Sequence, residues 1–148
     1  MVEFIVRKAL KKDFPAIREL ILEVHINPTG LDWHHFLVAM TLEDKLLGCG
    51  QIKSHFDRSR ELASIAVQEH SRGHGVARAI IQELLACEIL RPIYLLCRAR
   101  LESLYDKFGF RTIGPDDMPF YFQSIRLVEL IINTRARPEN RLSVMRLE

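Results

Sequence analysis

The 148-residue sequence predicts an α/β fold, with a mixed central β-sheet, helices on both faces and a C-terminal helix/strand extension. Three observations indicate this class. Short apolar runs alternate with segments of helical periodicity in the order β-α-β-β-β-α-β-α-β. One strand is followed by a glycine-containing turn and a helix, the arrangement in which α/β sheets bind ligands. The length suits one domain, residues 1–148, that buries roughly 70% of its unfolded surface.

The first half of the chain contains a strand, a helix and a hairpin. Residues 4–7 form a short β-type run, and residues 13–25 carry apolar side chains at helical spacing. Asp13 is expected to cap this helix, with Pro15 in its first turn. Residues 36–41 and 46–54 flank a polar turn and predict a β-hairpin. Gly48 and Gly50 in its second arm indicate a bulge or a close neighbour.

The second half repeats this alternation. We expect a strand at residues 61–67, a helix from 76 to about 89, and a strand at 93–97. A short helix then ends at Gly109 and precedes a strand at 110–113. Residues 121–133 predict another helix, and residues 142–147 a last strand. Phe120, Tyr121 and Phe122, around the start of this helix, pack in the core, cover a binding groove or an open sheet edge, or contact a second subunit.

Composition excludes several classes of function. A net charge of +2 is too small to favour nucleic acid, and no apolar run has the roughly 18 residues of a membrane span. The start of the sequence lacks a signal-peptide pattern, and the three cysteines have no metal-ligand spacing, so we expect a cytoplasmic protein without a metal. His34 and His35 are adjacent and point apart, which argues against a shared metal ion.

The stretch from Leu62 to Arg78 predicts an anion-binding cradle. Gly73 and Gly75 let the backbone approach a ligand closely, and the first N–H groups of the following helix have no partner inside it. A dinucleotide fingerprint would need a glycine where Arg78 stands, and no Gly-Lys-Ser/Thr occurs, so Rossmann and P-loop sites are both excluded.

Two motifs resemble those of the GCN5-related N-acetyltransferase (GNAT) superfamily. That family's pyrophosphate loop, Q/R-x-x-G-x-G/A, is matched by His70-Ser71-Arg72-Gly73-His74-Gly75, with histidine at the first position. Its later Y-x-K-x-G-F motif is matched by Tyr105-Asp106-Lys107-Phe108-Gly109-Phe110. The family's frequent asparagine seven residues before the tyrosine is Arg98 here. The resemblance extends from the first strand through Phe110 and implies the GNAT fold.

The resemblance also implies a set of site residues. Tyr105 would donate a hydrogen bond to the departing CoA sulfur, or else be a core tyrosine. Glu61 would act as base through water, or else be an exposed strand-end carboxylate; Ser64, His70 and His55 are further relay candidates. The predicted acetyl-CoA contacts lie along one strand and the following turn: Ile65, Ala66, Val67, Ser71, Arg72, Gly73, His74, Gly75, Val76 and Ala77. Arg72 and Arg78 supply positive charge there or are simply solvated.

The expected function is therefore transfer of an acetyl group from acetyl-CoA, the co-substrate, to a primary amine by direct attack. The acceptor is a small molecule or a peptide, and the protein a monomer or a homodimer, with no nucleic-acid or membrane partner. The alternative is a catalytically inactive GNAT-fold module that binds acyl-CoA or a protein partner.

Overall fold

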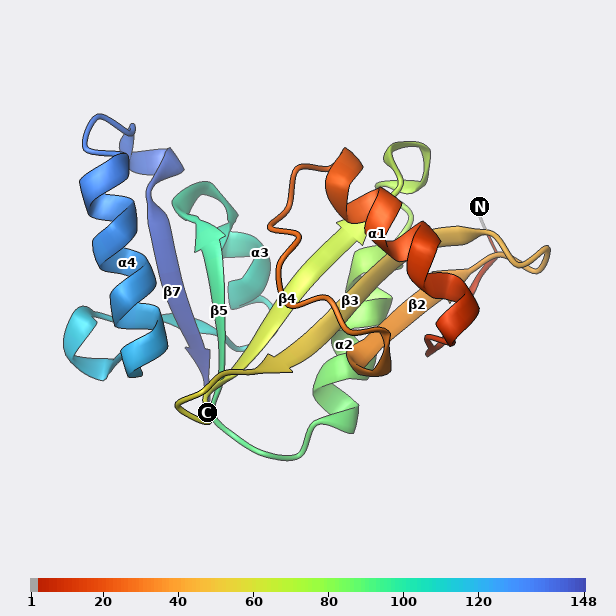
Figure 1. The fold of residues 1–148 in the computed structure, drawn as a ribbon, viewed down its shortest axis with the longest axis horizontal. Coiled ribbons are helices and arrows are strands. Elements are labelled where there is room, and N and C mark those ends of the chain that lie inside the picture. The colour runs from red at the N-terminus through yellow and green to blue at the C-terminus, as the bar shows by residue number, and fades with distance from the viewer. Residues whose placement is uncertain (1–2) are drawn as a thin grey trace. The chain divides into compact units, whose positions relative to one another are not determined.

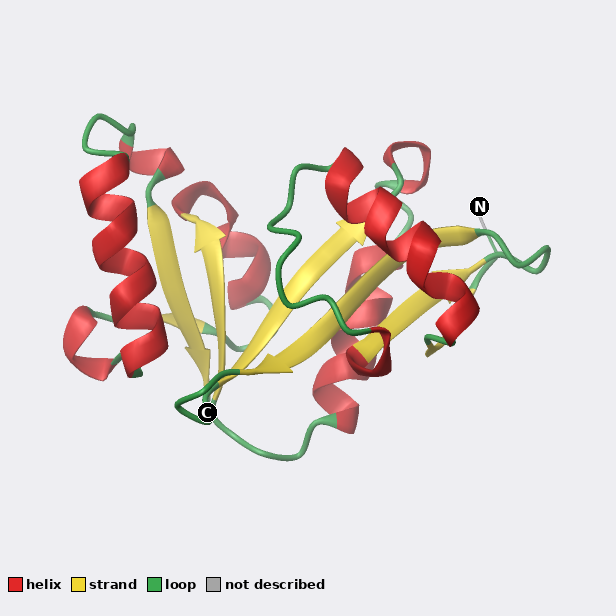
Figure 2. Ribbon diagram, in the orientation of Figure 1, coloured by secondary structure: helices red, strands yellow, loops and turns green. Residues whose placement is uncertain are grey.

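A computed structural model describes residues 3–148, which form two compact units (Figure 1). The first contains residues 3–53 together with Leu62–Ile89, and the second contains Ser54–Glu61 together with Leu90–Glu148. Figure 2 shows the strands and helices, with a long loop leading from the first helix toward the second strand. Among the described residues, no helix is both long and apolar enough to cross a lipid bilayer.

The first unit holds most of an antiparallel sheet with one helix on each side. Its strands are β1 (Ile5–Lys8), β2 (Phe36–Met40), β3 (Leu46–Ser54) and β4 (Arg60–Val67), adjacent in that order. Helix α1 (Phe14–Glu23) lies in front of these strands in Figure 1, and helix α2 (Val76–Cys87) lies behind them. Since its apolar side chains recur at helical spacing, α1 buries one face against Phe36, Val38 and Met40 of β2.

The two glycines of β3 are explained by close neighbours. A Cβ on Gly48 would lie 2.9 Å from the carbonyl oxygen of Ala66 and 2.9 Å from Val76 Cγ1. A Cβ on Gly50 would lie 2.5 Å from Ile65 Cδ1. Real Cβ atoms do not approach this closely, so glycine allows α2 and β4 to pack against β3.

The second unit is built around the antiparallel pair β5 (Ile93–Arg98) and β7 (Leu142–Leu147), with the short β6 (Arg111–Thr112) beside β7. The first two residues of β4 pair in parallel with β5, including Glu61 opposite Tyr94. Helix α3 (Glu102–Asp106) follows β5, and helix α4 (Phe120–Ile132) packs through the fully buried Phe122. Short 3-10 turns occur at Lys11–Asp13, Trp33–His35, Glu69–Ser71, Ala99–Leu101, Pro115–Asp117 and Pro138–Asn140.

The predicted order of elements and the mixed sheet with helices are confirmed. Several boundaries differ. Helix α1 ends at Glu23 because His25 adopts the left-handed region, with φ of 59°. Helix α2 ends at Cys87, two residues earlier than expected. The strand expected at residues 110–113 contains two residues and lies at the edge of the sheet, beside β7. Asp13 precedes α1 as expected but does not cap it: its carboxylate accepts bonds from Leu10 N–H and Arg7 instead.

Candidate functional site

Strand β4 carries a backbone irregularity that the sequence did not indicate. Ser64 has a φ of 59°, the left-handed region that a non-glycine residue rarely adopts, and its side chain is buried. Gln51 on β3 donates to Ser64 Oγ at 2.9 Å and to the carbonyl oxygen of Gly30 at 3.3 Å. This bond holds the strained residue in place, as expected where strain persists at functional sites.

After Ser64 the predicted pantetheine-binding residues alternate in exposure. Ala66 is buried in the core beneath α1, while Ile65 and Val67 are half-buried. The Ile65 side chain lies on the α2 side of the sheet, against Gly50. These residues lead directly into the turn that begins α2, so the strand and turn form one continuous segment of the first unit.

The turn after β4 presents exposed glycine backbone at the start of a helix. Gly73 and Gly75 have φ of 81° and 82°, and a Cβ on either would meet nothing within 4 Å. Helix α2 begins at Val76, so its first N–H groups lack intrahelical acceptors. The N–H groups of Ser71 and Arg72 already bond to carbonyl oxygens of the preceding turn. The N–H groups of residues 71 and 72 are therefore not available to an anion, which narrows the predicted backbone donors to residues 73–77.

The polar side chains around this turn differ in their surroundings. Ser71 is fully buried, and its hydroxyl has no hydrogen-bond partner among the described residues. Arg72 is exposed, and its Nε donates to the carbonyl oxygen of Val67 at 3.4 Å. His74 and His70 are also exposed. Arg72 thus places a positive charge at the surface of the turn, beside the positive end of the α2 dipole, and the two imidazoles are exposed on the same turn.

Glu61, the predicted base, is buried in the second unit. Its Oε1 lies 2.7 Å from His55 Nε2, and the two side chains are 8% and 10% exposed. The alternative of an exposed strand-end carboxylate is therefore wrong. Of the three relay candidates, only His55 contacts Glu61, since Ser64 bonds to Gln51 and His70 lies on the exposed turn.

The His55 ring is held by residues that sequence reasoning did not connect with it. It stacks on Tyr121 with ring centroids 3.5 Å apart and 12° between the planes, and it meets the edge of Phe122 at 5.8 Å. Tyr121 N–H, at the start of α4, donates to Asp57 Oδ2 at 2.9 Å. The four residues form one cluster between the β3–β4 loop and α4, both in the second unit.

Asp57 remains a carboxylate within this cluster. Burial opposes its ionisation, but hydrogen bonds from the side chain of Ser59 and from Tyr121 N–H outweigh burial and hold the pKa of Asp57 below its usual value. Because Asp57 accepts hydrogen bonds from both Ser59 and Tyr121, it joins the β3–β4 loop to the first turn of α4. The dipole of α4 also favours a negative charge at this end of the helix. No sequence spacing indicates this contact, because it joins residues 64 positions apart.

Tyr105, the predicted donor to sulfur, lies on α3 and is half-buried. Burial, assisted by the neighbouring Cys97 sulfur, raises the pKa of Tyr105 to about 12. Its ring meets Phe110 edge to face at 6.4 Å. The phenol therefore stays protonated at neutral pH and is able to donate a hydrogen bond. No hydrogen bond or ring contact joins Tyr105 to Glu61 within residues 3–148.

Arg98 occupies the position where the related family often has asparagine, and its contacts are structural. Its guanidinium bonds to Glu129 on α4 at 2.5 Å and to the carbonyl oxygen of Asn140 at 3.2 Å. Hydrogen bonds from Asn133 and Arg98 lower the pKa of Glu129, which keeps the pair ionised. Arg98 thus ties the end of β5 to α4.

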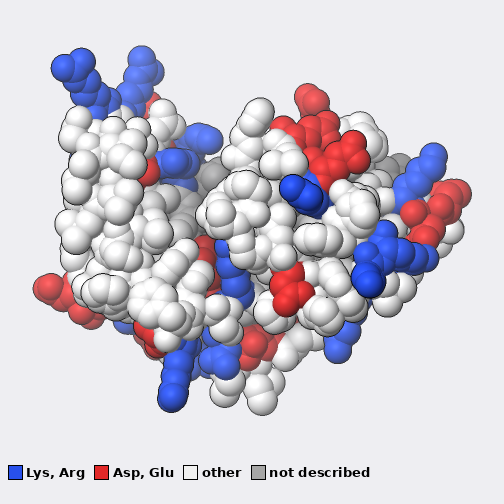
Figure 3. All heavy atoms as spheres, in the orientation of Figure 1, with Lys and Arg blue, Asp and Glu red and all other residues white. Residues whose placement is uncertain are grey.

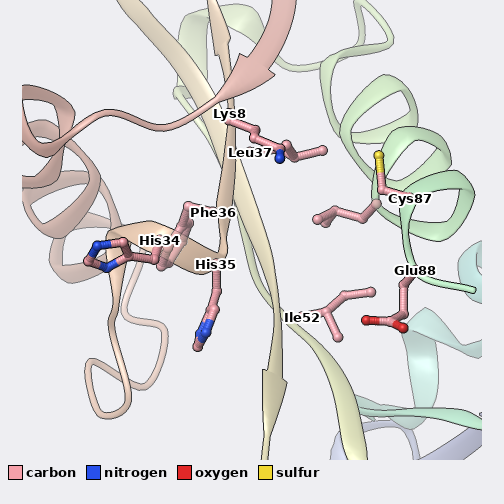
Figure 4. Close-up of a pocket in the computed structure, with 9 residues that line it drawn as sticks. Lys8, His34, His35, Phe36, Leu37, Ile52, Cys87 and Glu88 are labelled. Atoms are coloured by element: carbon pink, nitrogen blue, oxygen red, sulfur yellow. The ribbon is translucent and has the colours of Figure 1, made fainter. Parts of the chain in front are cut away.

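A separate pocket of about 200 Å³ lies in the first unit (Figure 4). His35 and Ile52 stand opposite Cys87 and Glu88 of the C-terminal end of α2. None of its lining residues belongs to the predicted site: Lys8, His34, His35, Phe36, Leu37, Ile52, Leu84, Cys87 and Glu88. Within residues 3–148, no cluster of three or more His, Cys, Asp or Glu is arranged to hold a metal ion.

The aromatic start of α4 has a divided role. Phe122 is fully buried, Tyr121 is half-buried and Phe120 is 65% exposed. Of the interpretations of this segment, core packing is thus confirmed for Phe122. Figure 3 shows an uncharged surface over much of α4. The exposed apolar side chains of the rest of the helix are Leu127, Val128, Leu130, Ile131 and Ile132.

A mixed sheet whose irregular strand leads through a glycine turn into a helix is the fold of the acyl-CoA N-acyltransferases. The chain shares 15% identity with such an enzyme from Pseudomonas aeruginosa, with a TM-score of 0.68 and 100% of each chain covered. This likeness shows the fold. Residues 32–112, more than half of the chain, match the family model of an acetyltransferase (GNAT) domain. The chain belongs to the GNAT acetyltransferase family.

Two further solved structures are similar to this chain. Rv2747 from Mycobacterium tuberculosis, in complex with CoA and a ligand designated NLQ, is 25% identical, with a TM-score of 0.73 and 97% of this chain and 98% of that chain covered. N-acetylglutamate synthase from Neisseria gonorrhoeae, complexed with coenzyme A and N-acetyl-glutamate, is 15% identical, with a TM-score of 0.74. That match covers 99% of this chain and 35% of the synthase. No curated protein sequence matches this chain.

Proposed function

We propose that this protein transfers an acetyl group from acetyl-CoA to a primary amine by direct attack. The observation that carries the proposal is the pair of left-handed glycines, Gly73 and Gly75, with open space outside both and a 12-residue helix behind them. Open glycine backbone at a helix N-terminus suits a diphosphate, because unpartnered N–H groups and the helix dipole both favour an anion there.

Residues of the first unit are proposed to hold the cofactor. The CoA diphosphate accepts hydrogen bonds from the N–H groups of residues 73–77, each contributing roughly 1.5–3 kcal/mol. Ile65, Ala66 and Val67 lie along the pantetheine arm, and Arg72 adds positive charge beside the turn. The likeness to proteins crystallised with CoA supports this assignment.

The acceptor must lose a proton before it attacks. The pKa of an alkyl ammonium, near 10, lies about three units above pH 7, so its deprotonation at pH 7 costs roughly 4 kcal/mol. We assign this proton to Glu61, directly or through water. The amine nitrogen then bonds to the thioester carbonyl carbon, the carbon–sulfur bond breaks, and the electron pair leaves on the CoA thiolate.

Tyr105 is proposed to stabilise the departing thiolate. A phenol whose pKa is raised to about 12 holds its proton more firmly than a CoA thiol does, so it donates a hydrogen bond without giving up the proton. The thiolate is protonated later by solvent. Burial favours this role, since a hydrogen bond to a developing charge is stronger where water is excluded.

The acceptor to test first is an α-amino acid. N-acetylglutamate synthase shares this fold, and its structure contains N-acetyl-glutamate, so an amino acid is the acceptor class that the comparisons favour. The experiment measures free CoA thiol after adding acetyl-CoA with glutamate, glutamine, a polyamine, an aminoglycoside or a lysine peptide. We expect thiol release with the amino acids above the rate of hydrolysis alone.

Two results would contradict the proposal in different ways. If CoA binds but no amine in the panel accelerates thiol release, the chain is a binding module of GNAT fold rather than an enzyme. If calorimetry detects no CoA binding, the assignment of the glycine turn is wrong.

A further inference from the structure

Glu61 has a buried partner that its proposed role does not require. A general base needs only an ionised oxygen and a route to the proton. Glu61 Oε1 is instead bonded to His55 Nε2 at 2.7 Å, with both side chains about nine-tenths buried. Because this bond engages Oε1, it restricts rotation of the carboxylate and so the directions in which Oε2 can face.

The imidazole is itself held on two sides. The Tyr121 ring lies parallel to it at 3.5 Å, and the edge of Phe122 meets it at 5.8 Å. Tyr121 is fastened in turn by its N–H group, which donates to Asp57 at 2.9 Å. A ring stacked in this way has little freedom to turn its Nε2 away from the carboxylate.

Resting on the proposed function, we propose that His55 is a positioning residue, which donates its Nε2–H to Glu61 Oε1 and so aims Oε2 at the acceptor proton. Glu61 takes one proton from the acceptor ammonium, directly or through water, and returns it to solvent after the acetyl group has moved. The other titratable groups around the pair are Asp57, Tyr121 and Tyr94, the last opposite Glu61 in the β4–β5 register.

The test compares two substitutions of His55. His55→Gln places an amide N–H near the position of Nε2, whereas His55→Leu fills the space without a donor. With the acceptor that gives the fastest thiol release, we expect His55→Leu to lower kcat about 10- to 100-fold, by the loss of a bond to a charged group. His55→Gln should recover most of that loss, and KM for acetyl-CoA should stay within about twofold in both variants.

The pH–rate profile separates positioning from packing. The donor favours the ionised carboxylate, so its removal should move the acid limb of the His55→Leu profile to higher pH, and His55→Gln should restore it. A cycle with Glu61→Gln is the second readout. Once the base is absent, His55→Leu should change kcat less than twofold further, because the two residues act as one unit.

Each outcome decides between the two ideas. If the wild-type protein transfers acetyl groups but the acid limb of His55→Leu is unmoved, the positioning role is wrong and the proposed function stands. The same holds if His55→Gln is as slow as His55→Leu, or if the Glu61→Gln background leaves the full effect. A wild-type chain that binds CoA and acetylates nothing overturns both. Thermal unfolding identifies any variant that fails to fold, and the His55→Gln comparison with wild type then decides alone.

Discussion

Replacing Gly73 by valine tests whether the glycine turn holds CoA. Gly73 has a φ of 81°, which an L-residue adopts at a cost of roughly 1–2 kcal/mol, and more for a β-branched side chain. A Cβ there meets nothing within 4 Å, so the added side chain disturbs no packing in the free protein. With typical stabilities of about 5–15 kcal/mol, the variant still folds.

The effect on CoA binding should be much larger than the effect on folding. The new side chain occupies the space outside the turn, so it holds the diphosphate away from the N–H groups of Gly73, His74 and Gly75. Loss of two such bonds at roughly 1.5–3 kcal/mol each removes about 3–6 kcal/mol. Because 1.4 kcal/mol is tenfold in Kd, calorimetric titration with CoA should show an affinity at least about 100-fold weaker.

Gly114→Val provides the matched control. Gly114 is equally open, with nothing within 4 Å of its Cβ position, but its φ of −86° is ordinary for any residue. The free energies of unfolding and of CoA binding of this variant should both equal those of the wild type within about 0.5 kcal/mol. If Gly73→Val binds CoA within threefold of wild type while remaining folded, the diphosphate does not lie on this turn and the cofactor assignment fails.

Three other substitutions address separate parts of the structure. Tyr105→Phe should lower kcat about tenfold or more with CoA affinity unchanged, and equal losses of kcat and affinity would make Tyr105 a packing residue. Since the pKa of Tyr105 is raised to about 12, its ionisation should remove no wild-type activity below about pH 10. Gly48→Ala places a Cβ 2.9 Å from a carbonyl oxygen of β4 and should destabilise by about 1–3 kcal/mol in urea unfolding; stability equal to that of Gly114→Ala would contradict the packing argument. Asp13→Asn should lose about 1–3 kcal/mol at pH 7, because the hydrogen bond from Arg7 lowers the pKa of Asp13. That contribution is present above the ordinary pKa of 3.8 and is lost as pH falls through the lower folded value, so a difference that persists unchanged to about pH 2 would refute it.

The elements were predictable where local signals act over a few residues. Periodicity placed α1, α2 and α4, and the glycines of the turn after β4 placed the start of α2. Boundaries were predicted less well, because tertiary contacts set them. Asp13 looked like a cap from its position, but an arginine from β1 takes its carboxylate. The short β6 lies at the edge of the sheet, where it pairs with β7, and the apolar residues on either side of it in the sequence are not part of the strand.

The site was predictable in its residue types and not in its partners. Gly73 and Gly75 were identified because they lie between a predicted strand and a predicted helix and because the Tyr105 motif follows them in the sequence. The left-handed Ser64 left no trace, since a serine within a β-type run reads as ordinary strand. His55 was only one of three relay candidates, because the sequence shows neither its contact with Glu61 nor the ring of Tyr121, 66 positions later, that stacks on it. Such contacts follow from the folded topology and not from local spacing.

The central claim is that the acetyl group of acetyl-CoA ends on the nitrogen of an amine acceptor. The most direct measurement follows an isotopically labelled acetyl group from acetyl-CoA by mass spectrometry and compares labelled acceptor with released CoA thiol. We expect one labelled, N-acetylated acceptor for each thiol released, with both yields falling together in Glu61→Gln and Tyr105→Phe. Thiol release that leaves the label as free acetate would contradict it.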